Sequence, residues 1–378
     1  MKLDTLLAQA GSRRDAHTGA IAVPIITSSA FQHPALGQST GFDYSRTSNP
    51  TRLAFEQTMA ALDGGAGAAA FASGLAAIDA LIRLFKPGDK LVVTEDLYGG
   101  TIRLFEKFGH LAGLDFIYVD SSDTAAVDKA LQTPGVKGLF VEIPTNPLLK
   151  VANLNELGAL SKKYQVLFIV DNTFLTPVLC RPLEHGADIS VYSATKYLGG
   201  HHDLIAGVAV ARTKELAERL TYIQNVAGAI LGPFESWLLL RSLKTLNLRM
   251  KKHGENALTV ARFLQNHPGV KNLHYPGLSS EAGYKTMLEQ AQGFGGMISF
   301  EVESPEKVKS VLATVKVFLF AESLGGAESL VTFPVKQTHA DLAPEIQAKL
   351  GLTDCLLRLS IGLEDAEDLV QDLASALA

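Results

Sequence analysis

The sequence predicts an α/β protein in which a mostly parallel sheet, flanked by helices, is followed by a smaller α+β domain at the C-terminus. Between residues 52 and 211, short apolar runs alternate with amphipathic helical stretches, and the runs are apolar throughout, as in strands buried on both faces. The 378 residues exceed the usual length of one domain. Hydrophobic residues make up 47% and charged residues 19%, which is typical of a chain with a large buried core.

The predicted elements begin after an N-terminal arm. The first 45 residues show weak periodicity and many turn-forming residues, so we expect an extended arm and no core element there. The expected strands cover residues 69–72, 91–94, 116–119, 138–142, 166–171, 189–193 and 207–211. The expected helices between them cover residues 75–85, 101–109, 124–131 and 154–163. This alternation is what a parallel sheet with helical crossovers requires.

The C-terminal part starts with one long helical pattern over residues 234–267, with a charged middle. We expect this helix to connect two domains and to be bent in its middle. Beyond it, expected strands at 297–302 and 356–361 and helices at 305–314 and 365–377 form the smaller domain. The expected organisation is an arm over residues 1–45, an α/β domain over 46–233, and the connecting helix with the α+β domain over 234–378.

Composition argues against several classes of partner. The formal net charge is −5 and the Lys and Arg residues are scattered, whereas a nucleic-acid-binding protein needs a dense basic face. No apolar run is long enough to span a membrane, and the N-terminus lacks the apolar region of a signal peptide. Two distant cysteines, Cys180 and Cys355, form neither a disulfide framework nor a zinc-binding spacing. We therefore expect a cytoplasmic protein.

Polar residues stand where several predicted strands end. Ser73, Asn146, Asp171 and Ser193 all occupy such positions. In open α/β sheets, ligands bind beyond the carboxyl ends of the strands. We therefore expect these four residues to converge on one ligand site.

Lys196 lies in the segment Ser193-Ala-Thr-Lys-Tyr-Leu-Gly-Gly-His-His202, directly after a predicted strand. Hydroxyl groups and free backbone N–H groups at a strand end are suited to a phosphate. A lysine beside such a phosphate can act as a cation or, when desolvated, form an imine with an aldehyde. Taken alone, the segment is more typical of a solvated loop lysine, because loop lysines are common.

Two further motifs are open to more than one interpretation. An aspartate that ends an apolar strand, as Asp171 does, needs a partner that offsets the cost of burying its charge. A pyridinium nitrogen, a helix N-terminus or a metal ion would each supply one. The segment Ala72-Ser-Gly-Leu-Ala-Ala77 opens a predicted helix, whose N-terminus attracts an anion. A simple strand-to-helix turn is, however, the commoner use of such a segment.

Tyr98 and Arg358 each have a functional and a structural interpretation. Tyr98, just past a predicted strand, can stack on a flat cofactor or belong to the core. Arg358 interrupts an apolar strand, and its guanidinium can pair with an internal carboxylate or with that of a substrate. His201-His-Asp203 does not predict a metal site, because adjacent residues rarely converge on one ion and no distant ligand is evident.

These motifs occur together and in order, and in that combination the chain resembles the Cys/Met-metabolism PLP-dependent (transsulfuration) enzymes over nearly its whole length. PLP is pyridoxal 5′-phosphate. The resemblance implies the type I fold, which is that of aspartate aminotransferase. The motifs are Asp43-Tyr-Ser-Arg46, Asn49-Pro-Thr-Arg52, Ala72-Ser-Gly74, residues 96–100, Glu142-Ile-Pro-Thr-Asn-Pro147, Asp171-Asn-Thr-Phe174, residues 193–201, Ala321-Glu-Ser-Leu-Gly325 and Leu357-Arg-Leu-Ser360.

The resemblance implies a cofactor site within the α/β domain. Lys196 is expected to hold PLP as a Schiff base and to carry protons, with Tyr98 stacked on the ring and Asp171 paired with the pyridine nitrogen. Tyr44 and Arg46 are expected to reach the phosphate of a neighbouring subunit, in a homotetramer whose active sites are shared. The residues expected to bind the phosphate are Gly74, Leu75, Ser193 and Thr195.

The resemblance also implies a site for amino-acid substrates. The segment that contains Glu322 is similar to the corresponding segment of family members that act on γ-substituted substrates. We therefore expect γ-replacement on O-acetyl- or O-succinylhomoserine with cysteine or sulfide, giving cystathionine or homocysteine in methionine and cysteine biosynthesis. His202 stands where the family commonly has Ser or Asn, a small departure that leaves the role of Lys196 unchanged. The residues expected to hold the substrate and its carboxylate are Asn146, Ser323, Arg358 and, as a further candidate, Arg103.

Three alternatives remain open. A cystathionine γ-lyase or β-lyase would release a keto acid, ammonia and a thiol amino acid from the same kind of site. An aminotransferase on the same fold would pass the amino group to a keto acid, and the segment around Lys196 fits that class poorly. A non-catalytic α/β binding protein is the third, and the intact set of Lys196, Asp171, Tyr98 and Arg358 argues against it.

Overall fold

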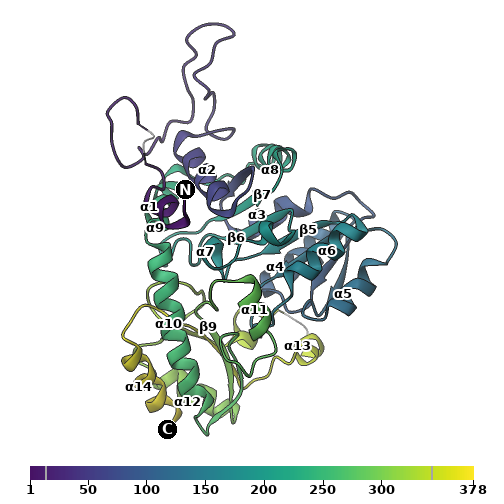
Figure 1. Cartoon of the computed structure of the whole chain (residues 1–378), viewed down its shortest axis with the longest axis vertical. Coiled ribbons are helices and arrows are strands. Elements are labelled where there is room, and N and C mark those ends of the chain that lie inside the picture. The colour runs from purple at the N-terminus through teal and green to yellow at the C-terminus, as the bar shows by residue number, and fades with distance from the viewer. Residues whose placement is uncertain (13–14, 342–343) are drawn as a thin grey trace.

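The structure, a computed structural model, describes residues 1–12, 15–341 and 344–378 and is built around two β-sheets (Figure 1). The larger sheet has seven strands in the order β1-β7-β6-β5-β4-β2-β3. Its strands are β1 (Gly67–Phe71), β2 (Lys90–Thr94), β3 (Asp115–Val119), β4 (Val136–Glu142), β5 (Leu167–Asp171), β6 (Ile189–Ser193) and β7 (Gly207–Ala211). Strands β3, β2, β4, β5 and β6 are parallel, whereas β7 runs antiparallel to both β1 and β6. The predicted fold class, with a mostly parallel sheet, is confirmed.

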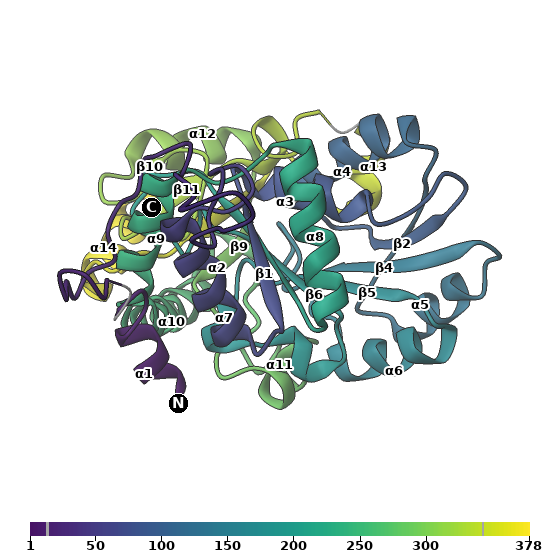
Figure 2. The ribbon, with the colours of Figure 1, turned by 90° about the horizontal axis from the view of Figure 1, so that it is seen from above.

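Helices cover both faces of this sheet, and Figure 2 shows α4 and α6 on opposite sides of β4 and β5. Val92 and Val93, neighbours in β2, belong to two separate hydrophobic cores, one on each face. Because successive side chains of a strand point to opposite faces, this double burial explains why the strands are apolar throughout. The helices of one face are α3 (Gly74–Ile82), α4 (Gly99–Leu104) and α8 (Lys214–Ala227). Those of the other are α2 (Pro50–Asp63), α5 (Thr124–Leu131), α6 (Leu154–Tyr164) and α7 (Thr176–Leu179).

The pattern over residues 234–267, predicted as one long helix bent in the middle, forms two helices, α9 (Pro233–Leu243) and α10 (Leu246–Gln265). The guanidinium of Arg249 lies across the break and donates to the carbonyl of Ser242 at 3.1 Å. It thereby satisfies one of the carbonyl groups that a helix end leaves unpaired. Arg249 and His253, part of the charged stretch in the sequence, are both buried.

The smaller domain contains a five-stranded sheet in the order β10-β11-β12-β9-β8. Its core lies between this sheet and α10, α12 and α14, with Phe300 and Leu359 fully buried. The strands are β8 (Val270–His274), β9 (Met297–Val302), β10 (Leu319–Phe320), β11 (Leu330–Thr332) and β12 (Leu356–Ser360). Its helices are α11 (Tyr284–Gln290), α12 (Pro305–Thr314), α13 (Pro344–Leu350) and α14 (Ala366–Leu377). Single helical turns of other types cover Phe105–Gly109, Pro182–His185 and Pro334–Lys336.

The N-terminal arm is only partly extended. It begins with α1 (Leu3–Ala8), and Leu7 is buried in the core shared with α2 and α10. The expectation that the arm holds no core element is therefore wrong at its start, because a six-residue helix is too short to show a periodic pattern. Residues 32–41 are exposed, and the dark purple segment that contains them extends away from the body in Figure 1. In the described part of the chain, no helix is both long and apolar enough to cross a membrane.

Candidate active site

The carboxyl ends of the parallel strands form one side of a cavity of about 640 Å³, and the smaller domain lines the other side through β12 and the segment between β10 and β11. Most of the residues predicted for the site are brought together here, although they are separated by up to 284 positions in the chain, from Gly74 to Arg358. Those that line the cavity are Gly74, Leu75, Tyr98, Asn146, Asp171, Ser193, Thr195, Lys196, Glu322, Ser323 and Arg358.

Lys196 occupies the turn that follows β6, and its Nζ donates a hydrogen bond to Ser323 Oγ at 3.1 Å. Burial lowers the pKa of the Lys196 ammonium to about 8, and the nearby positive charge of Arg358 acts in the same direction, while Glu322 opposes both. An appreciable fraction of this amine is therefore neutral near physiological pH. A neutral, partly desolvated lysine is a nucleophile and a base.

Ser323 links this lysine to the arginine of the smaller domain. Its carbonyl accepts a hydrogen bond from Arg358 Nη2 at 3.3 Å, while its hydroxyl contacts Lys196. Its backbone has a φ of 112°, which is unfavourable for a residue with a side chain. Such strain persists only where the surroundings enforce it, and it is commonest at ligand sites.

Asp171 ends β5 inside the cavity. One carboxyl oxygen, Oδ1, accepts the backbone N–H of Thr173 at 3.0 Å and its hydroxyl at 2.6 Å. No other hydrogen bond to Asp171 side-chain oxygens occurs in the described residues, so Oδ2 is available to a ligand. Burial raises the pKa of the Asp171 carboxyl to about 6, against the effect of the Thr173 bonds. A cationic ligand group beside Asp171 would restore its ionised form.

The part of the cavity lined by Ser73, Gly74 and Leu75 is suited to an anion. Helix α3 begins there, and the first N–H groups of a helix have no partner within the helix. Gly74 allows the turn to approach β6, because a Cβ at this position would lie 2.9 Å from Ser193 Cβ. The Ser193 hydroxyl has no hydrogen bond within the described part of the protein, whereas Thr195 Oγ1 already bonds Ala206.

Arg358 is 1% exposed, yet it forms no ion pair with any carboxylate of the residues that the structure describes. Its Nη1 donates to Asn146 Oδ1 at 2.6 Å and its Nη2 also contacts Thr332 Oγ1 at 3.3 Å, while its Nε has no hydrogen-bond partner among residues 1–12, 15–341 and 344–378. Burial lowers the pKa of Arg358 only to about 10, so the group stays cationic at neutral pH. Of the two partners considered for this arginine, a ligand carboxylate fits the structure better.

Three predicted residues do not line the cavity. Tyr44 is exposed on the arm, and Arg46 donates to the backbone and side-chain oxygens of Asn225 at 2.7 and 3.0 Å. Arg103 faces away and forms an exposed ion pair with Asp341. Arg103 and the two arm residues therefore lie outside the cavity of their own chain.

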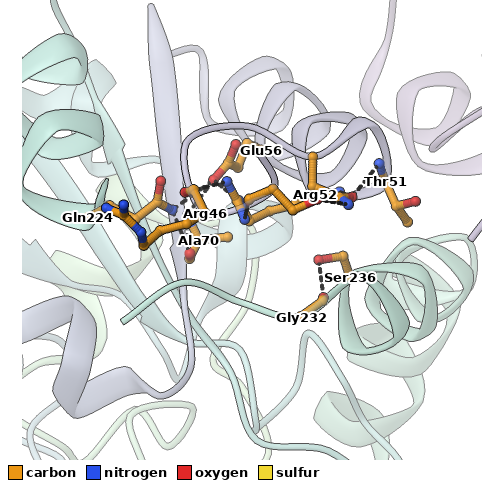
Figure 3. Close-up of polar contacts among 10 residues, drawn as sticks. Arg46, Thr51, Arg52, Glu56, Ala70, Gln224, Gly232 and Ser236 are labelled. Carbon is orange, nitrogen blue, oxygen red and sulfur yellow. Dashed lines mark hydrogen bonds and ion pairs between the residues drawn. The ribbon is translucent and has the colours of Figure 1, made fainter. Parts of the chain in front are cut away.

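The arm is fastened to the body just behind Arg46. The buried guanidinium of Arg52 donates to the carbonyl oxygens of Ser45 at 2.7 Å and Arg46 at 3.1 Å. Its Nε lies 3.5 Å from Glu56, whose carboxylate also accepts bonds from the Ala70 N–H and the Gln224 amide, both at 2.9 Å (Figure 3). This network joins the arm to α2, β1 and α8.

Sequence reasoning missed several residues that line the cavity. Glu142 ends β4 and His202 follows the lysine turn with a φ of 55°. Glu142 could have been found by the rule applied to Asp171, because both end a parallel strand. His202 carries no such signal. Within the described residues, no group of three or more His, Cys, Asp or Glu side chains is placed to hold a metal ion.

Comparison with known proteins agrees with this geometry. The sequence model for the Cys/Met metabolism PLP-dependent enzymes matches residues 4–378. The chain belongs to this family. Cystathionine gamma-lyase of Bacillus subtilis is 48% identical over 100% of this chain and 99% of its own length. Cystathionine gamma-synthase/O-acetylhomoserine (thiol)-lyase of the same organism is 48% identical over 99% of this chain and 96% of its own. Relatives named cystathionine beta-lyase also match.

Solved structures of Cys/Met metabolism PLP-dependent enzymes superpose on the whole chain. Cystathionine gamma synthase from Xanthomonas oryzae pv. oryzae, in complex with aminoacrylate and cysteine, has a TM-score of 0.98 and 40% identity, covering 100% of this chain and 98% of that one. The resemblance inferred from the motifs is thereby confirmed. The protein is a PLP-dependent enzyme of transsulfuration chemistry, and its cofactor is pyridoxal 5′-phosphate.

The residues that line the cavity fit pyridoxal 5′-phosphate. The unpaired Oδ2 of Asp171 suits a protonated ring nitrogen, and the partly neutral amine of Lys196 suits an aldehyde. The N-terminus of α3 and the unpaired hydroxyl of Ser193 suit a phosphate. The three kinds of group that PLP requires are therefore present in one cavity.

Proposed function

We propose that the enzyme catalyses γ-replacement on an O-acylated homoserine. The sulfur of cysteine or of sulfide forms a bond to Cγ, the Cγ–O bond breaks, and acetate or succinate leaves. The products are cystathionine or homocysteine. The observation that carries this proposal is the position of Glu322, which lines the same cavity as Lys196 and is close enough to act on its pKa.

Glu322 is an anionic side chain on the substrate side of the cavity. When cysteine is the thiol, a γ-replacement enzyme handles two amino acids, the acylated homoserine and the incoming cysteine, and each carries an ammonium group in solution. Arg358 supplies the cation for one α-carboxylate, and Glu322 supplies an anion for an ammonium or for a proton released at the reacting carbons. The resemblance of the segment Ala321-Glu-Ser-Leu-Gly325 to enzymes acting on γ-substituted substrates supports the same conclusion.

The remaining roles follow from the site geometry. When bound, PLP supplies an aldehyde for the substrate amine and a ring that withdraws electrons from Cα. We propose that Lys196 Nζ removes the Cα proton, that Asp171 keeps the ring nitrogen protonated and that Tyr98 stacks on the ring. Asn146 and Ser323 hold Arg358 in place, since both bond its guanidinium. The proposed phosphate ligands are Gly74, Leu75, Ser193 and Thr195.

The direct test uses the PLP-loaded enzyme with O-acetylhomoserine and cysteine, and quantifies cystathionine by mass spectrometry. We expect cystathionine and acetate in equal amounts. A parallel reaction with O-succinylhomoserine compares the two acyl groups. Bound PLP without any cystathionine would overturn the γ-replacement proposal.

C–S lyase activity is the second candidate, because a relative at 48% identity is named cystathionine gamma-lyase and others are named cystathionine beta-lyase. The lyase would release a keto acid, ammonia and a thiol amino acid from cystathionine. Incubation of the enzyme with cystathionine alone tests it. Release of cysteine with 2-oxobutanoate would indicate γ-cleavage, and release of homocysteine with pyruvate would indicate β-cleavage.

We also propose a cytoplasmic homotetramer in which the arm completes a neighbouring active site. Tyr44 and Arg46 support this, because they are polar, exposed and remote from the cavity of their own chain. Mass photometry of the PLP-loaded enzyme measures the assembly. A monomer with full activity would contradict the proposed sharing of sites.

A further inference from the structure

Glu142 lies inside the cavity, and none of the roles proposed above involves it. Strands β4 and β5 are parallel, and their register places Glu142 directly opposite Asp171. Both side chains therefore leave the same face of the sheet, and both line the cavity. Glu142 is 6% exposed. Two carboxyl groups thus stand side by side where a cofactor binds.

Glu142 has no counter-charge of its own in the described part of the chain. The charged groups that face it are Asp171 from β5, Asp96 from the loop after β2, and Arg358 from β12. Arg358 forms its hydrogen bonds with Asn146, Ser323 and Thr332 instead. Burial, followed by the charge of Asp171, raises the pKa of the Glu142 carboxyl well above its ordinary value.

One hydrogen bond shows what the Glu142 carboxyl does. Its Oε2 accepts the backbone N–H of Tyr98 at 3.1 Å, from a loop 44 residues earlier in the chain. The same loop is fixed on its other side, because a Cβ on Gly99 would lie 2.2 Å from the carbonyl oxygen of Thr338. The Tyr98 ring lies close to Gly100, where a Cβ would be 2.4 Å from Tyr98 Cε1. Glu142 is therefore part of the frame that sets the position of this ring.

We propose that Glu142 is a positioning residue that acts as a neutral carboxylic acid. As an acceptor it holds the Tyr98 backbone, and with it the aromatic ring, at the cavity. Being uncharged, it leaves Asp171 as the anion that faces the ring nitrogen of PLP. The inference rests on the roles proposed for Tyr98 and Asp171. Two adjacent carboxylates in a buried site repel each other, so one of them keeps its proton, and Asp171 is the one for which the cofactor supplies a cation.

The test compares Glu142→Gln with Glu142→Ala in the PLP-loaded enzyme, without substrate. Two quantities are measured: the apparent pKa of the visible absorbance of bound PLP, and the Kd of PLP for the apoenzyme. Gln is uncharged and keeps an oxygen acceptor for the Tyr98 N–H. We expect Glu142→Gln to shift the apparent pKa by less than about half a unit and to leave Kd within about threefold.

Glu142→Ala removes the acceptor of the part-buried hydrogen bond from the Tyr98 N–H. We expect Kd to rise about tenfold, as for one lost buried hydrogen bond, while the apparent pKa stays near that of the wild type. Both variants lack a charge at this position, and only glutamine keeps the acceptor, so the comparison of the two isolates the hydrogen bond to Tyr98.

Two outcomes would overturn the proposal. If Glu142 carries a negative charge, Glu142→Gln removes that charge. The protonated form of bound PLP is then less stable, and its apparent pKa falls by about one unit or more. If Glu142→Ala binds PLP as tightly as Glu142→Gln, the positioning role fails. Should the alanine variant not fold, the glutamine variant still decides the charge state.

Glu95→Gln is the matched control. This carboxylate stands three residues before Tyr98 but faces Lys150 and Lys349 outside the cavity, at 3.7 and 3.6 Å. We expect it to change neither quantity. Because both readouts are taken without substrate, failure of the γ-replacement reaction would leave this test intact. Failure of the Glu142 inference would in turn leave that reaction unaffected.

Discussion

Arg358 Nη1 lies 2.6 Å from Asn146 Oδ1, a contact that joins β12 of the smaller domain to the loop after β4 of the larger one. The two residues are 212 positions apart in the chain. Their contact places a buried guanidinium at the junction of the two domains, beside the lysine turn. Among the described residues, this guanidinium has hydrogen bonds but no ion pair with a carboxylate. The site therefore depends on how the two sheets are placed relative to each other.

Arg358→Lys tests the proposed carboxylate site. Lysine keeps the positive charge but cannot reproduce the planar fork that contacts Asn146, Ser323 and a carboxylate together. We expect the KM for the amino-acid substrate to rise about tenfold or more, with the absorbance of bound PLP unchanged. Steady-state kinetics and a visible spectrum measure both. Arg83→Lys, in an exposed pair with Asp79, is the control, and an unchanged KM for Arg358→Lys would exclude the role.

The lowered pKa of Lys196 predicts how the apoenzyme takes up PLP. Only the neutral amine attacks an aldehyde, so the rate of uptake should rise with pH below the Lys196 pKa of about 8 and level off above it. Stopped-flow absorbance of apoenzyme mixed with PLP follows this. Lys196→Ala should lose both the visible band and turnover. Turnover near the wild-type rate in that variant would contradict the assignment.

Asp171→Asn separates cofactor binding from reactivity. The amide keeps the size of the side chain and can still contact Thr173, but it cannot stabilise a protonated ring nitrogen. We expect PLP to be retained and kcat to fall about 100-fold or more. The measurements are PLP content and kcat. Asp128→Asn, outside the cavity, is the control. A kcat equal to that of the wild type would mean that Asp171 is only structural.

Arg52→Met tests the anchor of the arm. The substitution leaves Glu56 buried without its cation and frees the carbonyl groups of Ser45 and Arg46, which should destabilise the fold by about 3–5 kcal/mol. Urea unfolding measures this. The double variant Arg52→Met/Glu56→Gln should recover part of the loss, because no unpaired charge remains.

The control for this anchor is Arg83→Met, which breaks an exposed pair and should cost less than about 1 kcal/mol. If Arg52 also positions the arm for a neighbouring site, Arg52→Met should lose PLP more readily on dilution than the control does. Equal stability of the two variants would contradict the role of Arg52 as an anchor.

The strands of the larger sheet could be predicted well because each is a short apolar run bounded by turn-forming residues. The predicted strand 207–211 coincides with β7 (Gly207–Ala211). Its antiparallel direction could not be predicted, since direction depends on which strands it pairs with. A bend in the middle of the pattern over residues 234–267 was expected, but the break lies nearer its start, at residues 244–245. Its position could not be predicted, because it is stabilised by Arg249, a contact made only in the folded chain.

Site residues could be predicted where they stand at the carboxyl end of a predicted parallel strand, because those ends meet at one edge of the sheet. Asp171 and Ser193 end their strands, Asn146 lies four residues beyond β4, and all three line the cavity. Arg103 has no such constraint, and its ion pair with Asp341 joins residues 238 positions apart in the chain. The charge state expected for Glu142 depends on its neighbours in the folded protein, so the sequence alone contains no sign of it.

Arg249 bridges more than the break between two helices. Its Nη1 donates to the carbonyl oxygen of Tyr197 at 2.7 Å, and Tyr197 directly follows Lys196. The guanidinium also occupies the space beside Gly200, where a Cβ would lie 2.1 Å from Nη1. One side chain thus holds the turn that carries the lysine against the junction of α9 and α10. The placement of the reactive amine therefore depends on residues far from the cavity, at the point where the two domains are joined.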